Sequence, residues 1–351
     1  MHRSFACRSV VFSAAFAFGV AVMLSACGPE PPQAFEHRFT GEAMGTTWTV
    51  KVIRPVDRPL SDAESESLQT AIEAELEAVN RSMSTYLADS ELSLLNAAPA
   101  AEAQELSPSL AEVLAEALRV SAQTGGAFDV TVGPLVDAWG FGPANAPTPP
   151  SDAELEALRA RVGWRFLELD ADARTLTRGA DGVQIDLSAL AKGYAVDRVF
   201  ERLRATGEAD ILVEVGGETR TGGRNREGVG WRLGIEKPQA TRAVQRLVQL
   251  EDEALATSGD YRNARRLADG SWVSHLIDPR TGRTADHVTA SVSVLRPTCI
   301  EADALATAYM ILGPDEGLAL ATRDGVPALF LVRDGDNLRE IASPAFQNRS
   351  T

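Results

Sequence analysis

An aspartate and a threonine spaced four residues apart could hold a hard cation late in this chain of 351 residues. Asp303 and Thr307 lie in an apolar stretch, 302–312, that we expect to be helical, and helical residues i and i+4 share a face. The carboxylate and the hydroxyl would therefore point the same way, and oxygen ligands suit Mg²⁺ or Ca²⁺. An Asp in the first turn of a helix is also stabilised by the helix dipole, so the spacing alone leaves a structural role open.

A second segment with chemical potential is 186–194, Asp-Leu-Ser-Ala-Leu-Ala-Lys-Gly-Tyr. We predict that it joins a strand over 183–187 to a helix over about 191–205. The first N–H groups of a helix are free to meet phosphate, and carbonyls in the preceding turn can meet a cation. Lys192 would add a positive charge. Simple helix capping by Asp186 and Ser188 would explain the same residues.

Histidine is scarce, which makes each one a candidate. The chain has four, His2, His37, His275 and His287, so a zinc site built from several histidines would need carboxylates as well. His275 lies on a predicted strand just before a Pro-x-x-Gly turn at 279–282. A lone histidine on a strand is more often structural than catalytic, so only its scarcity singles it out.

Further candidates lie in turns and loops that mix polar and aromatic residues. Asp260 belongs to the turn Thr-Ser-Gly-Asp-Tyr-Arg at 257–262, whose polar groups could cap a ligand. Met, Tyr and Phe side chains in three other segments could line a pocket for a flat ring, or could equally belong to the core. These segments are Met-Gly-Thr-Thr at 44–47, Ser-Thr-Tyr at 84–86 and Gly-Gly-Ala-Phe-Asp at 125–129.

The elements that must position these residues follow one another irregularly. A strand is predicted over 45–53, capping boxes at Ser61 and Ser151 begin two helices, and Ser107-Pro108 begins another. Several successive strands lack a helix between them, which favours an α+β fold with mixed, largely antiparallel sheets over a doubly wound sheet. The other expected strands cover 164–169, 174–178, 211–215, 231–236, 244–250, 272–277, 288–295 and 328–332.

Charge and motif content exclude several classes of protein. Acidic residues outnumber basic ones by 49 to 34, for a net charge of −15, which argues against a nucleic-acid binder. The sequence has no Walker A motif, no G-x-G-x-x-G after a strand and no G-x-S-x-G elbow, so P-loop, Rossmann and α/β-hydrolase activities lack their signatures. A bound phosphate would have to be held locally, by a metal or by backbone N–H groups.

The N-terminus resembles a bacterial lipoprotein signal. Two arginines precede an apolar run over 10–24, which is short for a membrane span but suits the h-region of an export signal. Leu-Ser-Ala-Cys at 24–27 resembles a lipobox and implies cleavage before Cys27 and acylation of its thiol. An ordinary signal peptide with an incidental Cys is the alternative. Cys299 would then be the only other thiol of the mature chain, so no internal disulfide is expected.

This signal sets the predicted organisation of the chain. We expect a signal peptide over 1–26, a lipidated Cys and tether over 27–37, and one domain over 38–345. The lipid anchor would hold the protein on the periplasmic side of a membrane. We favour the inner membrane. However, position 28 is Gly rather than the Asp that is associated with inner-membrane retention, so the outer membrane remains an alternative.

Taken together, eight colinear segments resemble the FAD:protein FMN transferase family, often called ApbE-type. Any one of them is weak, but their order along nearly the whole mature chain is specific. Three new blocks join those quoted above: Val-Glu-Val-Gly-Gly-Glu, Ser-His-Leu-Ile-Asp-Pro-Arg-Thr-Gly and Ala-Asp-Ala-Leu-Ala-Thr. The eight segments are 44–47, 84–86, 125–129, 186–197, 213–218, 257–262, 274–282 and 302–307.

The resemblance implies an ApbE-like fold with an active site in a cleft between two subdomains, and a role for each matched residue. Asp303 and Thr307 would bind Mg²⁺ through their side chains, and the carbonyl of Ala191 would be a third ligand unless a neighbouring carbonyl serves instead. Some members have Gly-Glu-Gly at 191–193, so Lys192 need not be essential. The residues that would contact FAD or lie beside it are Met44, Tyr86, Ala127, Phe128, Asp129, Ser188, Tyr194, His275 and Ile277.

The implied reaction is Mg²⁺-dependent transfer of FMN from FAD to a Thr or Ser hydroxyl of an acceptor protein, with release of AMP. His275 is our first candidate for the general base and Asp260 the second, while Asp303 would serve catalysis through the metal. Periplasm-exposed subunits of membrane redox complexes, such as Na⁺-translocating quinone reductase or Rnf-type complexes, are the expected acceptors. A periplasmic FAD pyrophosphatase and a non-catalytic flavin-binding lipoprotein are the alternatives.

Overall fold

The computed structural model describes residues 34–143, 148–239, 243–260, 264–267, 270, 272–285, 288–335 and 337–349. The predicted signal peptide and Cys27 lie outside these residues. The helices are α1 (Asp62–Met83), α2 (Glu91–Ala97), α3 (Pro108–Gln123), α4 (Gly133–Ala138), α5 (Asp152–Arg159), α6 (Ala191–Ala205), α7 (Cys299–Arg323) and α8 (Pro344–Gln347), with a 3-10 turn at Trp164–Phe166. Among the described residues, no helix combines the length and the apolar character needed to cross a membrane.

The strands belong to one large sheet and three small ones. The large sheet holds β1 (Ala34–Ala43), β2 (Thr46–Pro55), β6 (Asp210–Val215), β7 (Glu218–Gly222), β10 (Ala254–Gly259), β13 (Thr289–Arg296), β14 (Ala328–Asp334) and β15 (Asn337–Ala342). The small sheets hold β3 (Gln104–Glu105), β4 (Leu167–Asp170) and β5 (Thr175–Arg178); β8 (Trp231–Glu236) and β9 (Val244–Leu250); and β11 (Ala264–Arg266) and β12 (Trp272–Ser274).

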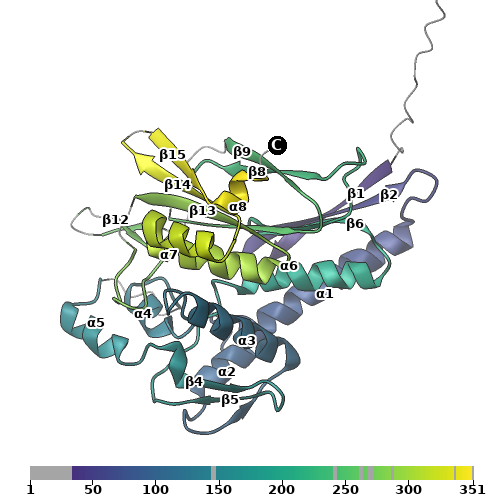
Figure 1. The fold of residues 1–351 in the computed structure, drawn as a ribbon. Coiled ribbons are helices and arrows are strands. Elements are labelled where there is room, and N and C mark those ends of the chain that lie inside the picture. The colour runs from purple at the N-terminus through teal and green to yellow at the C-terminus, as the bar shows by residue number, and fades with distance from the viewer. Residues whose placement is uncertain are drawn as a thin grey trace, which may run out of the picture.

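The large sheet forms the upper part of the molecule in Figure 1. Its order is β1-β2-β6-β7-β10-β13-β14-β15, and each neighbouring pair runs antiparallel. A doubly wound fold would instead have parallel strands joined by helical crossovers. The predicted α+β fold with antiparallel sheets is therefore confirmed.

Helices cover one face of this sheet, and a β-ribbon with a short helix covers the other. In Figure 1, α1, α6 and α7 lie below the sheet, and β8 and β9 lie above it. Helix α8 belongs to the same side as the ribbon, because its Phe346 packs with Ile235 of β8 and Leu250 of β9. Successive side chains of a strand point to opposite faces, so β13 contributes to two cores. Val292 and Val294 belong to the main core with α7, whereas Leu295 packs with Leu331 and Phe346 beneath the ribbon.

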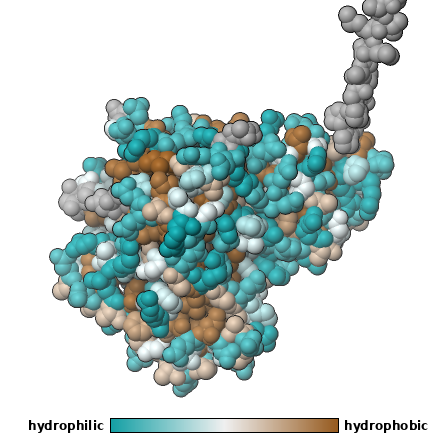
Figure 2. Space-filling model, in the orientation of Figure 1, coloured by the Kyte–Doolittle hydropathy of each residue, from teal (hydrophilic) through white to brown (hydrophobic). Residues whose placement is uncertain are grey.

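The segment between α1 and α6 forms a second lobe, which contains α2 to α5 and the β3-β5-β4 sheet (Figure 1). The lobe meets the helical layer where α3 contacts α1 and α7, and where the hydroxyl of Tyr194 on α6 donates to Glu112 on α3. Figure 2 shows this side of the molecule as mostly hydrophilic, with hydrophobic residues gathered in patches over both lobes. The start of α6 therefore lies at the boundary between the lobes.

Several local predictions are confirmed. Both capping boxes form, with Ser61 and Ser151 accepting from the N–H three residues later. Ser107 caps α3, and α6 spans 191–205 as expected. The boundary of the tether differs from the prediction, because β1 pairs with β2 from Ala34 onward and so includes four residues that we assigned to the tether.

Two predicted strands are wrong. The segment 183–187 joins no sheet, and its contact with the rest of the fold includes an isolated bridge to Val132. The side chain of Asn96 takes the place of a neighbouring strand there, since its amide donates to the Ile185 carbonyl and its oxygen accepts from the Ile185 N–H. The strand expected over 272–277 ends at Ser274, whose hydroxyl accepts from the Leu276 N–H and turns the chain.

Candidate functional site

Asp303 lies in the second turn of α7, where this helix touches α6 most closely. A Cβ atom on Gly193 of α6 would lie 2.5 Å from the carbonyl oxygen of Cys299 and 2.9 Å from Cβ of Asp303. Only a glycine permits this approach, which brings the Gly193 N–H to 3.0 Å from Oδ2 of Asp303. Asp303 is only 3% exposed, so its charge depends on such neighbours rather than on water.

Lys192 and Glu218 complete a charged cluster around Asp303. Nζ of Lys192 lies 2.5 Å from Oε1 of Glu218 and 3.8 Å from Oδ2 of Asp303. Burial raises the pKa of Asp303 to about 7, Lys192 opposes that rise and the charge of Glu218 adds to it. Burial lowers the pKa of Lys192, but the two carboxylates outweigh this effect and hold it above its usual range.

Thr307 lies one turn after Asp303 on α7, as the spacing predicted. Its hydroxyl is 3.0 Å from the hydroxyl of Ser258 on β10, and either oxygen can be the donor. Ser258 lies one position before the end of β10 at Gly259. The sheet thereby fixes the direction of the Thr307 side chain.

Ala191 is the first residue of α6 and is buried. The turn before it is fixed from two sides: Asp186 N donates to the Val130 carbonyl at 2.7 Å, and Ser188 N donates to Oδ1 of Asp186 at 2.8 Å. Ser188 itself is exposed. Asp186 thus orders the turn through local bonds, while its backbone ties the turn to the second lobe.

The oxygen atoms available around Asp303 are of the kinds that bind a hard divalent cation. A buried carboxylate whose pKa is raised by burial and by a second carboxylate would be kept ionised by a bound cation, and hydroxyl and carbonyl oxygens suit Mg²⁺. Asp303, Thr307 and the Ala191 carbonyl would supply these ligands. Among the described residues, no group of three or more His, Cys, Asp and Glu forms a metal cluster, so such a site would use only one or two carboxylates.

The loop after α3 turns its predicted FAD-contacting side chains inward. Gly125 and Gly126 have positive φ angles of 63° and 84°, which let the chain reverse after α3. Phe128 and Asp129 are almost fully buried, as is the alanine between them and the glycines. Asp129 accepts from the Thr131 N–H and hydroxyl and from the Trp164 N–H. Burial raises the pKa of Asp129, against these hydrogen bonds. Its carboxylate therefore orders the loop.

Two other predicted FAD contacts differ in exposure. Met44, with a φ of 52°, forms the turn between β1 and β2 and packs against the edge of the main core. Tyr86 is 70% exposed, and its hydroxyl donates to the Phe141 carbonyl at 3.4 Å. Tyr194, in contrast, is buried, and burial is the main cause that raises its pKa to about 12.

His275 and Ile277 follow directly after β12, in a segment that packs against the second lobe. The His275 ring lies edge-on to the Phe141 ring, with 6.3 Å between centroids, and Phe141 also accepts the bond from Tyr86. Ile277 is buried in an apolar cluster with Trp139. The structure therefore brings Tyr86, Phe141 and His275 together, and Phe141 is the member that sequence reasoning missed.

Asp260 is held in a different way from His275. Its two carboxylate oxygens each lie 2.7 Å from a guanidinium nitrogen of Arg333 on β14. This bidentate pair engages both oxygens as acceptors. Asp260 thus links the end of β10 to β14 through this ion pair.

Glu218 is a further residue of the site to which sequence reasoning gave no role. It ends the quoted block at 213–218, and the signal available was a carboxylate directly after two glycines. Both glycines have positive φ, 62° at Gly216 and 108° at Gly217, so the chain reverses there and β7 begins with Glu218 beside Lys192.

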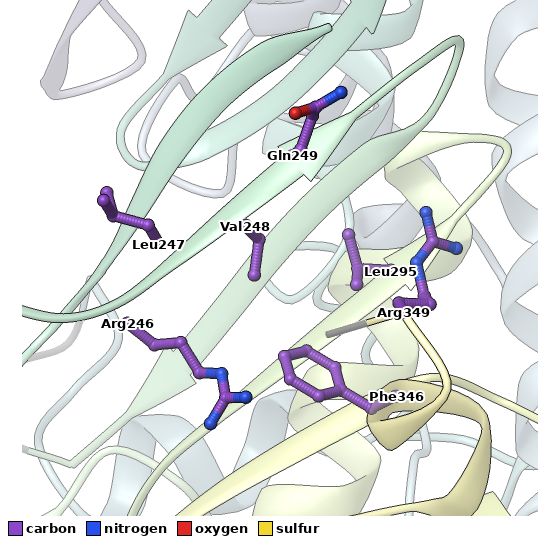
Figure 3. Close-up of a pocket in the computed structure, with 7 residues that line it drawn as sticks. All are labelled: Arg246, Leu247, Val248, Gln249, Leu295, Phe346 and Arg349. Atoms are coloured by element: carbon purple, nitrogen blue, oxygen red, sulfur yellow. The ribbon is translucent and has the colours of Figure 1, made fainter. Parts of the chain in front are cut away.

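A separate pocket of about 240 Å³ lies away from this cluster, beneath the β8–β9 ribbon. Figure 3 shows Val248 and Phe346 between the two arginines, Arg246 and Arg349, with Leu295 beside Arg349. Those arginines are paired with acidic residues, Arg246 with Glu340 and Arg349 with Glu253. None of the residues predicted to act on FAD lines this pocket. Its lining residues are Arg246, Leu247, Val248, Gln249, Leu295, Phe346 and Arg349.

Comparison with known sequences points to one family. The model of the ApbE family matches residues 44–330. The FAD:protein FMN transferase of Vibrio cholerae is 43% identical over 330 residues, which cover 93% of this chain and 96% of the relative. The protein of the same name from Escherichia coli is 34% identical over 349 residues, with 97% of each chain covered.

Comparison with solved structures agrees. The flavin transferase ApbE from Vibrio cholerae has a TM-score of 0.81 and 41% identity, covering 90% of this chain and 99% of that one. The apo form of the flavinyl transferase ApbE from Pseudomonas stutzeri also has a TM-score of 0.81, with 38% identity and coverage of 90% and 97%.

Proposed function

This chain belongs to the ApbE family, and on that basis we propose that it transfers the FMN part of FAD to a hydroxyl of an acceptor protein. The acceptor would be a Thr or Ser side chain, the new bond a phosphoester, and AMP the leaving group. The observation that carries the proposal for this chain is the buried Asp303 with Thr307 one turn later and Lys192 beside it. In this proposal, that cluster would hold the cation beside the diphosphate of FAD.

The residues of the cluster would act by position and charge. Asp303, Thr307 and the Ala191 carbonyl would hold Mg²⁺, which, when bound, stabilises negative charge on the diphosphate as a Lewis acid. Lys192 would add a cation near the phosphates while Glu218 restrains its ammonium group. The Gly193 N–H keeps Oδ2 of Asp303 fixed, so little reorganisation is needed when the substrate binds.

The chemical step would use His275, which lies beside Phe141. The acceptor oxygen attacks the phosphorus nearest riboflavin, the bond from that phosphorus to the AMP phosphate breaks, and the hydroxyl proton passes to His275. Tyr86, exposed beside Phe141, would contact the flavin or its ribityl chain. Met44 and the loop 125–129 would shape the pocket for the rest of FAD.

The place of action follows from the N-terminal signal. Acylation of Cys27 would anchor the protein on the periplasmic side of a membrane, the inner membrane by preference. Because β1 begins at Ala34, only a short tether would separate the folded part from the lipid. Periplasm-exposed subunits of membrane redox complexes would then be within reach as acceptors.

The test is incubation of the protein with FAD, Mg²⁺ and a candidate acceptor domain, followed by the intact mass of the acceptor. A gain equal to FMN minus water, lost when the acceptor Thr is replaced by Ala, supports the proposal. Free FMN and AMP with an unchanged acceptor would instead show a pyrophosphatase. FAD that is bound but never consumed would show a flavin-binding lipoprotein.

A further inference from the structure

The N-terminus of α7 is capped by a residue of another helix. Thr298, the N-cap residue of α7, makes no capping hydrogen bond with its own side chain. Instead, Asp197 of α6 accepts from the N–H of Cys299 through Oδ1 and from the N–H of Ile300 through Oδ2, both at 2.9 Å. The first N–H groups of a helix have no partner within it, and here a tertiary contact satisfies two of them.

Arg220 fixes the same carboxylate from the sheet. Nη1 of this β7 residue lies 2.9 Å from Oδ1 of Asp197. Its guanidinium is also held from two other sides, by the Phe200 ring at 4.2 Å from the centroid and by Glu201 at 2.9 Å. Three elements, α6, α7 and β7, therefore meet at Asp197, which is only 7% exposed.

The contact at Asp197 is geometrically linked to the candidate cation site. Asp197 lies four residues after Gly193, on the same face of α6. Gly193 lies against the Cys299 carbonyl, and its N–H donates to Asp303. One turn later on α6, Asp197 accepts from the N–H groups of Cys299 and Ile300. The two ties together set how far α7 can slide or rotate against α6. They thereby set where Asp303 lies relative to the start of α6.

We propose that Asp197 is a positioning residue for the cation site: it holds α7 in register on α6, so that Asp303 and Thr307 keep their places relative to the start of α6, to which Ala191 belongs. This inference rests on the proposed function, because it concerns the Mg²⁺ site of that reaction. Groups that orient metal ligands typically change metal affinity by about 10–100-fold when they are altered. A cap that only stabilises the helix would lower stability without changing that affinity.

The experiment measures Mn²⁺ binding to the full-length mature chain without FAD, by electron paramagnetic resonance of free Mn²⁺, together with the melting temperature. Asp197→Asn keeps the side-chain shape but replaces one acceptor oxygen by a donor. We expect the Mn²⁺ dissociation constant to rise about 10–100-fold. The Mg²⁺ concentration that half-saturates flavin transfer should rise in parallel, with a smaller change in kcat at saturating Mg²⁺.

Ser343→Ala is the matched control. Ser343 is a buried cap on the other face of the sheet, where its hydroxyl accepts from the N–H groups of Phe346 and Ala328. We expect a lower melting temperature than that of the wild type in this variant and also in Asp197→Asn. Its Mn²⁺ binding should stay that of the wild type.

A second variant separates positioning from capping and covers the case in which Asp197→Asn folds poorly. Thr298→Asp supplies a local cap for the first turn of α7, so the double variant Asp197→Ala, Thr298→Asp should regain melting temperature and still bind Mn²⁺ weakly. Recovery of wild-type Mn²⁺ binding in the double variant, or unchanged binding in Asp197→Asn, would overturn the positioning role. A wild-type chain that bound no Mn²⁺ would overturn the metal site of the proposed function itself, and this inference with it.

Discussion

The backbone N–H of Gly193 donates to the carboxylate of Asp303 across 3.0 Å, although 110 residues separate the two in the chain. The bond joins the start of α6 to the second turn of α7, and it forms only because Gly193 lacks a side chain. It also explains how a carboxylate can stay in place at 3% exposure. This close approach between two helices therefore helps to set the position of the site.

Gly193→Ala should destabilise the protein and disturb the site at once. The new Cβ would lie 2.5 Å from a backbone carbonyl oxygen, which cannot move aside as the end of a side chain can. Forcing an extra group into a packed contact costs about 1–3 kcal/mol. Urea unfolding should show this loss, and Mn²⁺ binding should weaken with it. Gly179→Ala is the control, because its Cβ would lie 3.5 Å from the nearest heavy atom. Equal stability of the two variants would contradict the close-contact argument.

Asp303→Asn should greatly slow flavin transfer while the fold remains. The variant keeps the side-chain volume and removes the charge that would hold Mg²⁺. Because Lewis-acid stabilisation supplies several kcal/mol, the transfer rate should fall at least about 100-fold. Asp324→Asn, at the end of the same helix and bonded to Arg323 and Gln123, should keep its rate. Intact mass of the acceptor over time measures both, and a normal rate in Asp303→Asn would remove the metal site from the mechanism.

Metal binding should depend on pH through Asp303. Burial first, and Glu218 second among the factors that raise it, bring the pKa of Asp303 from 3.8 to about 7. In the metal-free protein, the stability contributed by the protonated form is therefore complete below about pH 4 and lost as the pH rises towards 7. Since Mg²⁺ must displace this proton, its apparent affinity should rise about tenfold per pH unit up to pH 7 and then level off.

Calorimetric titration of Mn²⁺ between pH 5 and 8 measures this effect. A profile without slope below pH 7 would show that the carboxyl is ionised before the metal binds. Added Mg²⁺ should also restore the stability that the metal-free protein loses as the pH rises. In Asp303→Asn that pH-dependent loss should be smaller, since one of its causes is gone.

Local signals in the sequence predicted much of this fold, because caps and periodicity act within a few residues. Ser61 with Glu64, and the bounds of α6, were predictable in this way. Asp303 and Thr307 could be paired for the same reason, since both belong to one helix. Glu218 could not be added to them, because its approach to Lys192 follows from the turn at Gly216 and Gly217 and from the place of β7 in the sheet.

Other features depended on contacts between distant segments. The segment 183–187 has the composition of a strand, yet the side chain of Asn96 satisfies its backbone. Asp197 reads as an ordinary polar residue of a helix, and its role emerges only where α6 packs on α7. Asp129 lies in a block that suggests ligand contact, but its three hydrogen bonds are to its own lobe.

His275 and Asp260 should differ sharply as candidates for the general base. His275 lies beside Phe141, which also holds the exposed Tyr86, whereas both carboxylate oxygens of Asp260 are engaged by Arg333. We expect His275→Gln to lower the single-turnover rate of flavin transfer by about 10²–10⁴-fold at saturating Mg²⁺ and FAD. Asp260→Asn should cost less than about tenfold, because it weakens a partly exposed ion pair worth about 1 kcal/mol. His37→Gln controls for loss of an imidazole elsewhere, because His37 lies on β1 and its Nε2 accepts from the Leu60 N–H. If Asp260→Asn were the slower enzyme, proton transfer would have to be reassigned to the end of β10, and Arg333 would then be expected to release Asp260 when the acceptor binds.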